Sequence, residues 1–143
     1  NLFLRFGLEG LKKRNPQDLS GGEKQRLALC VALGKEADYY FLDEPTKGMD
    51  AKSKKIFGEL LKEWTKMGKS IVMVSHDMEF TAKYADEISL LYQGEIIVQC
   101  PVREFMEENQ FYTTGMNRVT RRVNPHIITI EDVKKYAKRK NSQ

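Results

Sequence analysis

Two carboxylates and a histidine each follow a short apolar run, and these residue types could bind a cation or take part in catalysis. Asp43 and Glu44 come directly after the run 39–42, and His76 directly follows the β-branched run 70–75. A continuous apolar run predicts a strand buried on both faces, and carboxylates there are costly unless they bind a cation or do chemistry. Because ligands bind at the carboxyl ends of parallel strands, the runs predict one shared site. The alternative is two solvated acids in a loop and a structural histidine.

A glycine-rich helix start is the second chemical feature. Ser20 and Glu23 have capping-box spacing, so a helix is expected to begin at Ser20 and to end at Gly34. Gly21 and Gly22 fall in its first turn, where each glycine costs about 1 kcal/mol relative to alanine. Free N–H groups and the helix dipole favour an anion here, and a phosphate fits best. On this stretch alone, an ordinary capped helix after a glycine turn fits equally well.

The elements that must position these residues alternate between helix and strand. This alternation predicts an α/β fold with a mostly parallel sheet flanked by helices. Alternating runs around Gln93-Gly94 add an antiparallel β-hairpin, and Thr129 and Asp132 cap a further helix in the tail. The expected elements are helices over 20–34, 50–67, 78–84, 101–108 and 129–139, strands over 39–42 and 70–75, and a hairpin over 88–99.

Length and composition are those of a small globular domain. The chain has 143 residues, with 41% hydrophobic and 31% charged side chains. No apolar run reaches the roughly 18–20 residues of a membrane span, and no signal peptide is expected. The start at Asn1, without Met, suggests a piece cut from a longer protein. Cys30 and Cys100 lack metal-ligand spacing and are expected to be buried and reduced, as in a cytosolic protein.

The positive charge is concentrated in the C-terminal tail. Residues 116–143 carry eight Lys or Arg against two acids, a net +6, so residues 1–115 carry −2 of the total +4. Such a tail can bind nucleic acid, an anionic membrane or an acidic protein. A solvated helix face is the preferred interpretation, and no nucleic acid is expected as a partner.

The segments LSGGEKQR at 19–26, YYFLDEPT at 39–46 and SHD at 75–77 resemble the ATP-binding-cassette (ABC) ATPases in order and spacing. The resemblance covers roughly residues 8–112. It implies part of a P-loop NTPase sheet, with the end of a helical signature subdomain over 1–34 and the C-terminal part of the ATPase core over 35–112. A basic tail with one helix would follow over 113–143. The tail is similar to segments that close ATPase domains of energy-coupling-factor importers, which take up vitamins and transition metals.

The resemblance implies roles in MgATP hydrolysis for the three residues at the predicted sheet edge. Asp43, in the Walker B position, would help hold Mg²⁺ through water, and Glu44 would orient or deprotonate the attacking water. His76 would contact the γ-phosphate. Asp50 would end the loop that couples the two sites of a head-to-tail dimer, although Lys47-Gly48-Met49 replaces the usual Ser-Ala-Leu. The residues that would close over the partner's nucleotide are Ser20, Gly21, Gly22, Glu23 and Gln25.

The phosphate cradle of such a domain does not occur in this sequence. No G-x-x-x-x-G-K-[ST] is found in the 143 residues. The chain is therefore expected to be the C-terminal half of an ABC nucleotide-binding domain, inactive alone and without tightly bound ATP. Without the missing elements, an apolar sheet edge and the faces that those elements would cover are expected to be exposed and to drive self-association or repacking.

The function expected from the resemblance is that of an ATP-hydrolysing subunit that powers substrate import by an ABC transporter. It would lie at the cytoplasmic face of the membrane, with a second ATPase domain and integral membrane subunits as partners. Two alternatives are a soluble ABC ATPase of translation or chromosomes, and an ABC-fold binding module without turnover.

Overall fold

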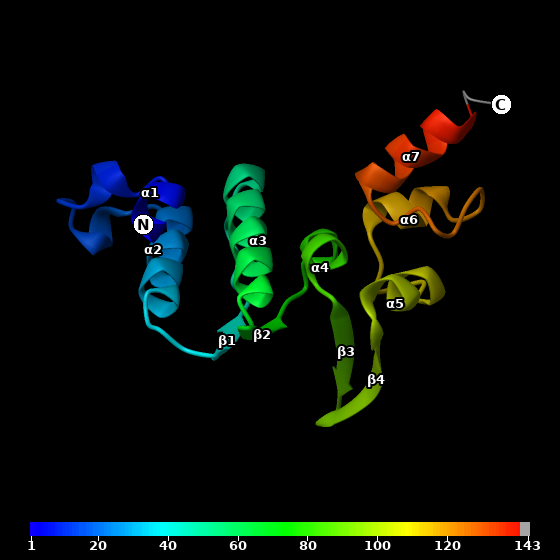
Figure 1. Ribbon diagram of the computed structural model, residues 1–143, viewed down its shortest axis with the longest axis horizontal. Coiled ribbons are helices and arrows are strands. Elements are labelled where there is room, and N and C mark those ends of the chain that lie inside the picture. The colour runs from blue at the N-terminus through cyan, green and yellow to red at the C-terminus, as the bar shows by residue number, and fades with distance from the viewer. Residues whose placement is uncertain (141–143) are drawn as a thin grey trace. The chain divides into compact units, whose positions relative to one another are not determined.

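The computed structural model describes residues 1–140 and divides into two compact units, Asn1–His76 and Asp77–Gln143 (Figure 1). The predicted alternation of helices and strands is confirmed in the first unit, and the predicted antiparallel hairpin lies in the second unit. The first unit contains α1 (Leu2–Arg5), 3₁₀ turns at Glu9–Leu11 and Pro16–Asp18, α2 (Gly21–Leu33), β1 (Tyr39–Asp43), α3 (Ala51–Lys66) and β2 (Ser70–Val74).

Helix α2 begins where its capping box predicts. The Glu23 N–H donates to Ser20 Oγ at 3.3 Å, and the Ser20 N–H donates to Glu23 Oε2 at 2.8 Å. The bond from the Ser20 N–H lowers the pKa of Glu23, with help from the Ser20 side chain, because a donor at the carboxylate favours its charged form. Gly34 ends the helix as its C-cap with φ −74°, so no left-handed residue is needed there.

Strands β1 and β2 form a two-stranded parallel sheet with Tyr40 opposite Ile71 and Asp43 opposite Val74. Helix α3 packs on one face, where the Tyr40 and Trp64 rings lie 4.9 Å apart and Tyr40 is buried. Figure 1 shows both strands beside one end of α3.

The expectation that these strands are buried on both faces is wrong for the described chain. Tyr39 and Phe41 are 68% and 77% exposed, and Val72 and Val74 are 56% and 60% exposed. Side chains alternate across a strand, so one set lies toward α3 and the other lies on the opposite, solvent-accessible face. Each apolar run thus alternates between side chains that α3 covers and side chains that are exposed to solvent.

Helix α3 is fixed at both ends. At its start, the Ser53 N–H donates to Asp50 Oδ1 at 2.7 Å, as expected for an N-cap. Along its length, Phe57 is fully buried against Phe6, with ring centroids 6.5 Å apart. At its end Gly68 adopts φ +85°, a left-handed conformation that glycine reaches without a Cβ penalty.

The second unit is built on a β-hairpin and a small apolar core. The hairpin turns at Gln93 (φ +50°) and Gly94 (φ +86°), and the core cluster centres on Val102, Met106 and Ile128. Pro101 is the N-cap of the following helix instead of its first residue. The elements are α4 (Met78–Tyr84), β3 (Glu87–Tyr92), β4 (Glu95–Pro101), α5 (Val102–Glu108), α6 (Gly115–Thr120) and α7 (Ile130–Lys140).

Helix α6 was not expected from the sequence, because buried polar contacts hold it in place. Asn117 is fully buried, and its Nδ2 donates to the carbonyls of Pro125 at 2.7 Å and Ile127 at 3.1 Å. The Asn117 N–H donates to Thr114 Oγ1 at 3.0 Å, and Thr113 Oγ1 donates to Asn117 Oδ1 at 3.2 Å. These bonds tie α6 to the loop before α7.

Both cysteines are free thiols, and burial raises the pKa of each. Cys30 is buried as expected, whereas Cys100 is only partly buried because β4 is largely open to solvent. Within residues 1–140, no helix has both the length and the apolar character needed to cross a membrane.

Candidate functional site

The carboxyl ends of β1 and β2 bring the predicted acid and histidine together. The parallel register continues one residue beyond β1, where the Glu44 N–H donates to the Val74 carbonyl at 2.9 Å. His76 follows two residues after Val74, so its ring reaches the same edge. The distance from His76 Nε2 to Glu44 Oε1 is 3.5 Å.

Glu44 has two features that ordinary surface acids lack. Its backbone adopts φ +43°, in the left-handed region that costs energy for a residue with a side chain. Its Oε1 atom is buried and accepts no hydrogen bond from any residue within 1–140. An unsatisfied buried acceptor costs about 1–3 kcal/mol. A water, cation or substrate group at this atom would remove that cost.

Asp43 and His76 are accessible at the same edge. The His76 side chain is 91% exposed, and Asp43 is also exposed. No group of three or more His, Cys, Asp or Glu residues converges on a metal-binding position in the described part of the chain. This arrangement fits Mg²⁺, which is commonly held by one or two carboxylates together with substrate phosphates and water.

Gln25 links α2 to the turn that carries Glu44. Its Nε2 donates to the Pro45 carbonyl at 3.2 Å and to the Glu44 carbonyl at 3.4 Å. The Glu44 carbonyl also accepts from the Lys47 N–H at 3.1 Å, which closes the turn. The amide nitrogen of Gln25 is thus engaged within its own chain, and a role at a partner's nucleotide stays a prediction.

The two signature glycines have different surroundings. A Cβ at Gly22 would lie 2.9 Å from the Gly48 carbonyl oxygen, so this position has no room for a side chain. A Cβ at Gly21 would meet no atom within 4 Å. Gly22 is therefore required by the close approach of the loop after β1, while Gly21 leaves the helix start open to a ligand.

Ser20, Glu23 and Asp50 act as helix caps in this structure. Ser20 Oγ and the Glu23 carboxylate are used by the capping box, although the Ser20 hydroxyl can still donate its proton. The Ser53 N–H lowers the pKa of Asp50, with help from the positive charges of Arg26 and Lys52. Their expected contacts with a nucleotide or a second domain stay predictions.

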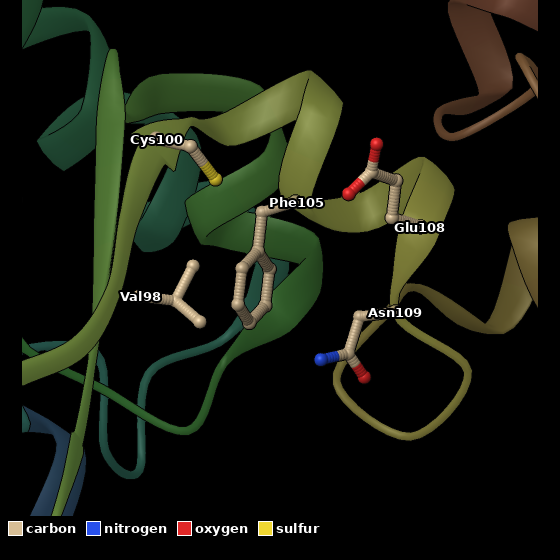
Figure 2. A pocket seen from close by; sticks show the side chains of 5 residues that line it. All are labelled: Val98, Cys100, Phe105, Glu108 and Asn109. Atoms are coloured by element: carbon tan, nitrogen blue, oxygen red, sulfur yellow. The ribbon is translucent and has the colours of Figure 1, made fainter.

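The structure also contains two shallow hollows. In the second unit, a hollow of about 160 Å³ lies between β4 and α5 (Figure 2). Val98, Cys100 and Phe105 give it an apolar wall, and Glu108 and Asn109 lie at the end of α5. A second hollow of about 260 Å³ is lined by Arg26, Asp50 and Lys52 with parts of α1 and α3. Neither is lined by Glu44 or His76.

Residues 1–47 match the family described as ABC transporter. A putative ABC transporter ATP-binding protein of Bacillus thuringiensis subsp. konkukian is 47% identical over 129 residues, which cover 90% of this chain and 23% of that relative. A putative ABC transporter ATP-binding protein of Pyrococcus furiosus is 44% identical over 101 residues, which cover 71% of this chain and 39% of the relative. The chain thus spans well under half the length of these relatives.

A solved structure with the same fold is cbiO1 from Clostridium perfringens, described as part of the ABC transporter complex cbiONQ. It superposes with a TM-score of 0.63 and 30% identity, covering 89% of this chain and 48% of that one. These similarities support assignment of the chain to part of an ABC transporter ATP-binding domain. The fold is the α/β fold of ABC ATPase domains.

Proposed function

We propose that this chain supplies the catalytic carboxylate, the γ-phosphate-sensing histidine and the signature helix of an ATPase that powers an ABC importer. The observation that carries the proposal is the meeting of Glu44 Oε1 and His76 Nε2 at 3.5 Å on the carboxyl edge of two parallel strands. ATP hydrolysis requires a group that positions the attacking water and others that stabilise charge on the transferred phosphoryl group.

In this proposal, Glu44 orients the attacking water and accepts its proton, because Oε1 is buried and accepts no hydrogen bond within residues 1–140 and so is available to a water. The exposed His76 ring can turn toward the γ-phosphate while keeping contact with Glu44. Asp43 would hold Mg²⁺ through water, and the ion would offset negative charge on the phosphates. The open backbone at Gly21 and the Ser20 hydroxyl would approach a nucleotide held by a second ATPase domain.

The proposed assembly contains two ATPase domains and integral membrane subunits at the cytoplasmic face of a membrane. The likeness to cbiO1, which is part of the ABC transporter complex cbiONQ, supports the energy-coupling-factor type. The phosphate cradle would come from a segment outside these 143 residues, so the chain alone would neither hold ATP tightly nor hydrolyse it. The exposed row of Tyr39, Phe41, Val72 and Val74 supports self-association of the isolated chain.

A second candidate function is action on ribosomes. An archaeal ribosome recycling factor, solved with a stalk protein, superposes with a TM-score of 0.63 and 28% identity and covers 74% of this chain. The cbiO1 likeness covers more of the chain at slightly higher identity and favours the importer.

MgATP turnover tests the proposed function in a complete ABC domain that contains residues 1–143. Glu44→Gln should reduce turnover by about 10²- to 10⁴-fold, the usual contribution of a general base, while nucleotide binding is retained. Glu36→Gln, an exposed acid away from the sheet edge, is the matched control and should keep full turnover. Unchanged turnover in Glu44→Gln would refute the assignment.

A further inference from the structure

The C-terminal end of the second unit carries a surface rich in exposed cations. Five of the last seven described residues are basic: Lys134, Lys135, Lys138, Arg139 and Lys140. All five are exposed, and α7 buries none of its side chains. Basic side chains in the last turn also suit the negative end of the helix dipole, so this charge does not destabilise α7.

The two acids of α7 anchor the start of the helix, and a hydrogen bond from Lys83, with a smaller part from the charge of Lys134, lowers the pKa of Glu131. Glu131 pairs with Lys83 of α4 at 2.7 Å, and Asp132 lies 3.4 Å from Arg103 of α5. Asp132 Oδ2 also accepts from the Thr129 N–H at 2.9 Å. The helix is therefore held at its acidic end, while its basic half extends away from these contacts.

Exposed aliphatic side chains accompany the basic ones. Val119 and Val123 are 81% and 73% exposed around Arg122, and Ile130 is 55% exposed at the start of α7. Buried hydrogen bonds from Thr114 to the Ile128 carbonyl and from Asn117 to the Ile127 carbonyl fix α6 beside the start of α7. We call residues 118–140 the basic C-terminal surface.

We propose that the basic C-terminal surface binds directly to an anionic phospholipid bilayer. Lys and Arg near a negatively charged bilayer are attracted to its headgroups, and exposed aliphatic side chains can enter the headgroup and acyl boundary. A surface for single-stranded nucleic acid would be expected to present aromatic side chains for base stacking, whereas the exposed large apolar residues within 118–140 are Val and Ile. The inference does not depend on ATP hydrolysis and adds a lipid contact to the proposed protein partners.

Vesicle co-sedimentation of the 143-residue chain tests this inference. The chain should bind vesicles of phosphatidylcholine with 30% phosphatidylglycerol at least tenfold more tightly than pure phosphatidylcholine vesicles, with the difference falling as salt rises. Replacing Lys134, Lys135, Arg139 and Lys140 by Gln should weaken binding about fivefold for each cation removed. The matched control replaces four exposed lysines of the first unit, Lys13, Lys35, Lys52 and Lys66, by Gln and should bind like the wild type.

A second variant separates charge from insertion. Val119→Ser with Val123→Ser should weaken vesicle binding while preserving its salt dependence, and circular dichroism should show each variant folded. The inference is overturned if the variant with four Gln substitutions in α7 binds anionic vesicles as tightly as the control with four Gln substitutions in the first unit. It is also overturned if both vesicle types bind equally, or if single-stranded RNA binds the chain more tightly than the anionic vesicles do.

Discussion

The side-chain amide of Gln25 donates to the carbonyl oxygens of both Glu44 and Pro45, at 3.4 and 3.2 Å. Gln25 lies in α2, so this helix supports the backbone of the turn that carries the proposed catalytic carboxylate of Glu44. Because Glu44 adopts φ +43°, this turn needs support from its surroundings.

Gln25→Leu should lower the free energy of unfolding by about 1–3 kcal/mol, since two hydrogen bonds are lost and two carbonyls lose a donor. Urea unfolding of the 143-residue chain measures this change. Lys24→Leu changes the neighbouring exposed side chain and should alter stability by less than about 0.5 kcal/mol. Equal effects of the two substitutions would contradict a supporting role for Gln25.

The two signature glycines should respond oppositely to alanine. Gly22→Ala places a methyl group 2.9 Å from the Gly48 carbonyl oxygen, so the loop after β1 must shift, at a cost of about 1–3 kcal/mol. Gly21→Ala meets no neighbour within 4 Å and should stabilise the helix by up to about 1 kcal/mol. Thermal unfolding of both variants is the measurement, and the reverse order would show that the close approach is wrongly described.

Asn117→Ala should destabilise the second unit by about 2–4 kcal/mol. The substitution removes both Nδ2 bonds and leaves the carbonyls of Pro125 and Ile127 without this donor in a buried site. Val119→Ala, in the same helix but 81% exposed, is the control and should have little effect. Hydrogen exchange of the α6 amides reports the loss locally, and unchanged protection would argue against the polar contacts as the source of order.

Acid should weaken the anchoring of α7 through Asp132. Burial raises the pKa of this carboxyl, but hydrogen bonds from Thr129 and Ile128 and the charge of Arg103 outweigh it, so the net pKa is lowered. Its contribution to stability is therefore complete above the unfolded value of about 3.9 and is lost as pH falls through the lower, folded value. Asp132→Asn should flatten this acid-dependent loss below about pH 4 in denaturation curves, and an unchanged slope would exclude Asp132 as its source.

The sequence predicted the features that depend on local chemistry. Ser20, Asp50 and Thr129 mark real helix starts because a capping side chain acts within three residues of its own position. The apolar runs placed β1 and β2, and their parallel pairing brings Glu44 and His76 together.

Features that depend on distant contacts could not be predicted in the same way. The sequence of α6 lacks the apolar periodicity that predicts a helix. Asn117 and Thr114 instead hold this helix through hydrogen bonds to backbone carbonyls up to 14 residues away. The apolar runs of β1 and β2 predicted two covered faces, because a run of apolar residues does not reveal which face a helix covers in the described chain. The contact between Gln25 and the Glu44 turn joins residues 19 positions apart and carries no local signal.

Whether Glu44 and His76 act together is tested most directly by a double-mutant cycle on MgATP turnover with Glu44→Gln and His76→Ala, in a complete ABC domain that contains residues 1–143. If the two residues act together on one phosphate, each single variant should lose most of the turnover, and the double variant should be no slower than the slower single variant. Losses that multiply, or full turnover in either single variant, would contradict a shared catalytic role at the edge of β1 and β2.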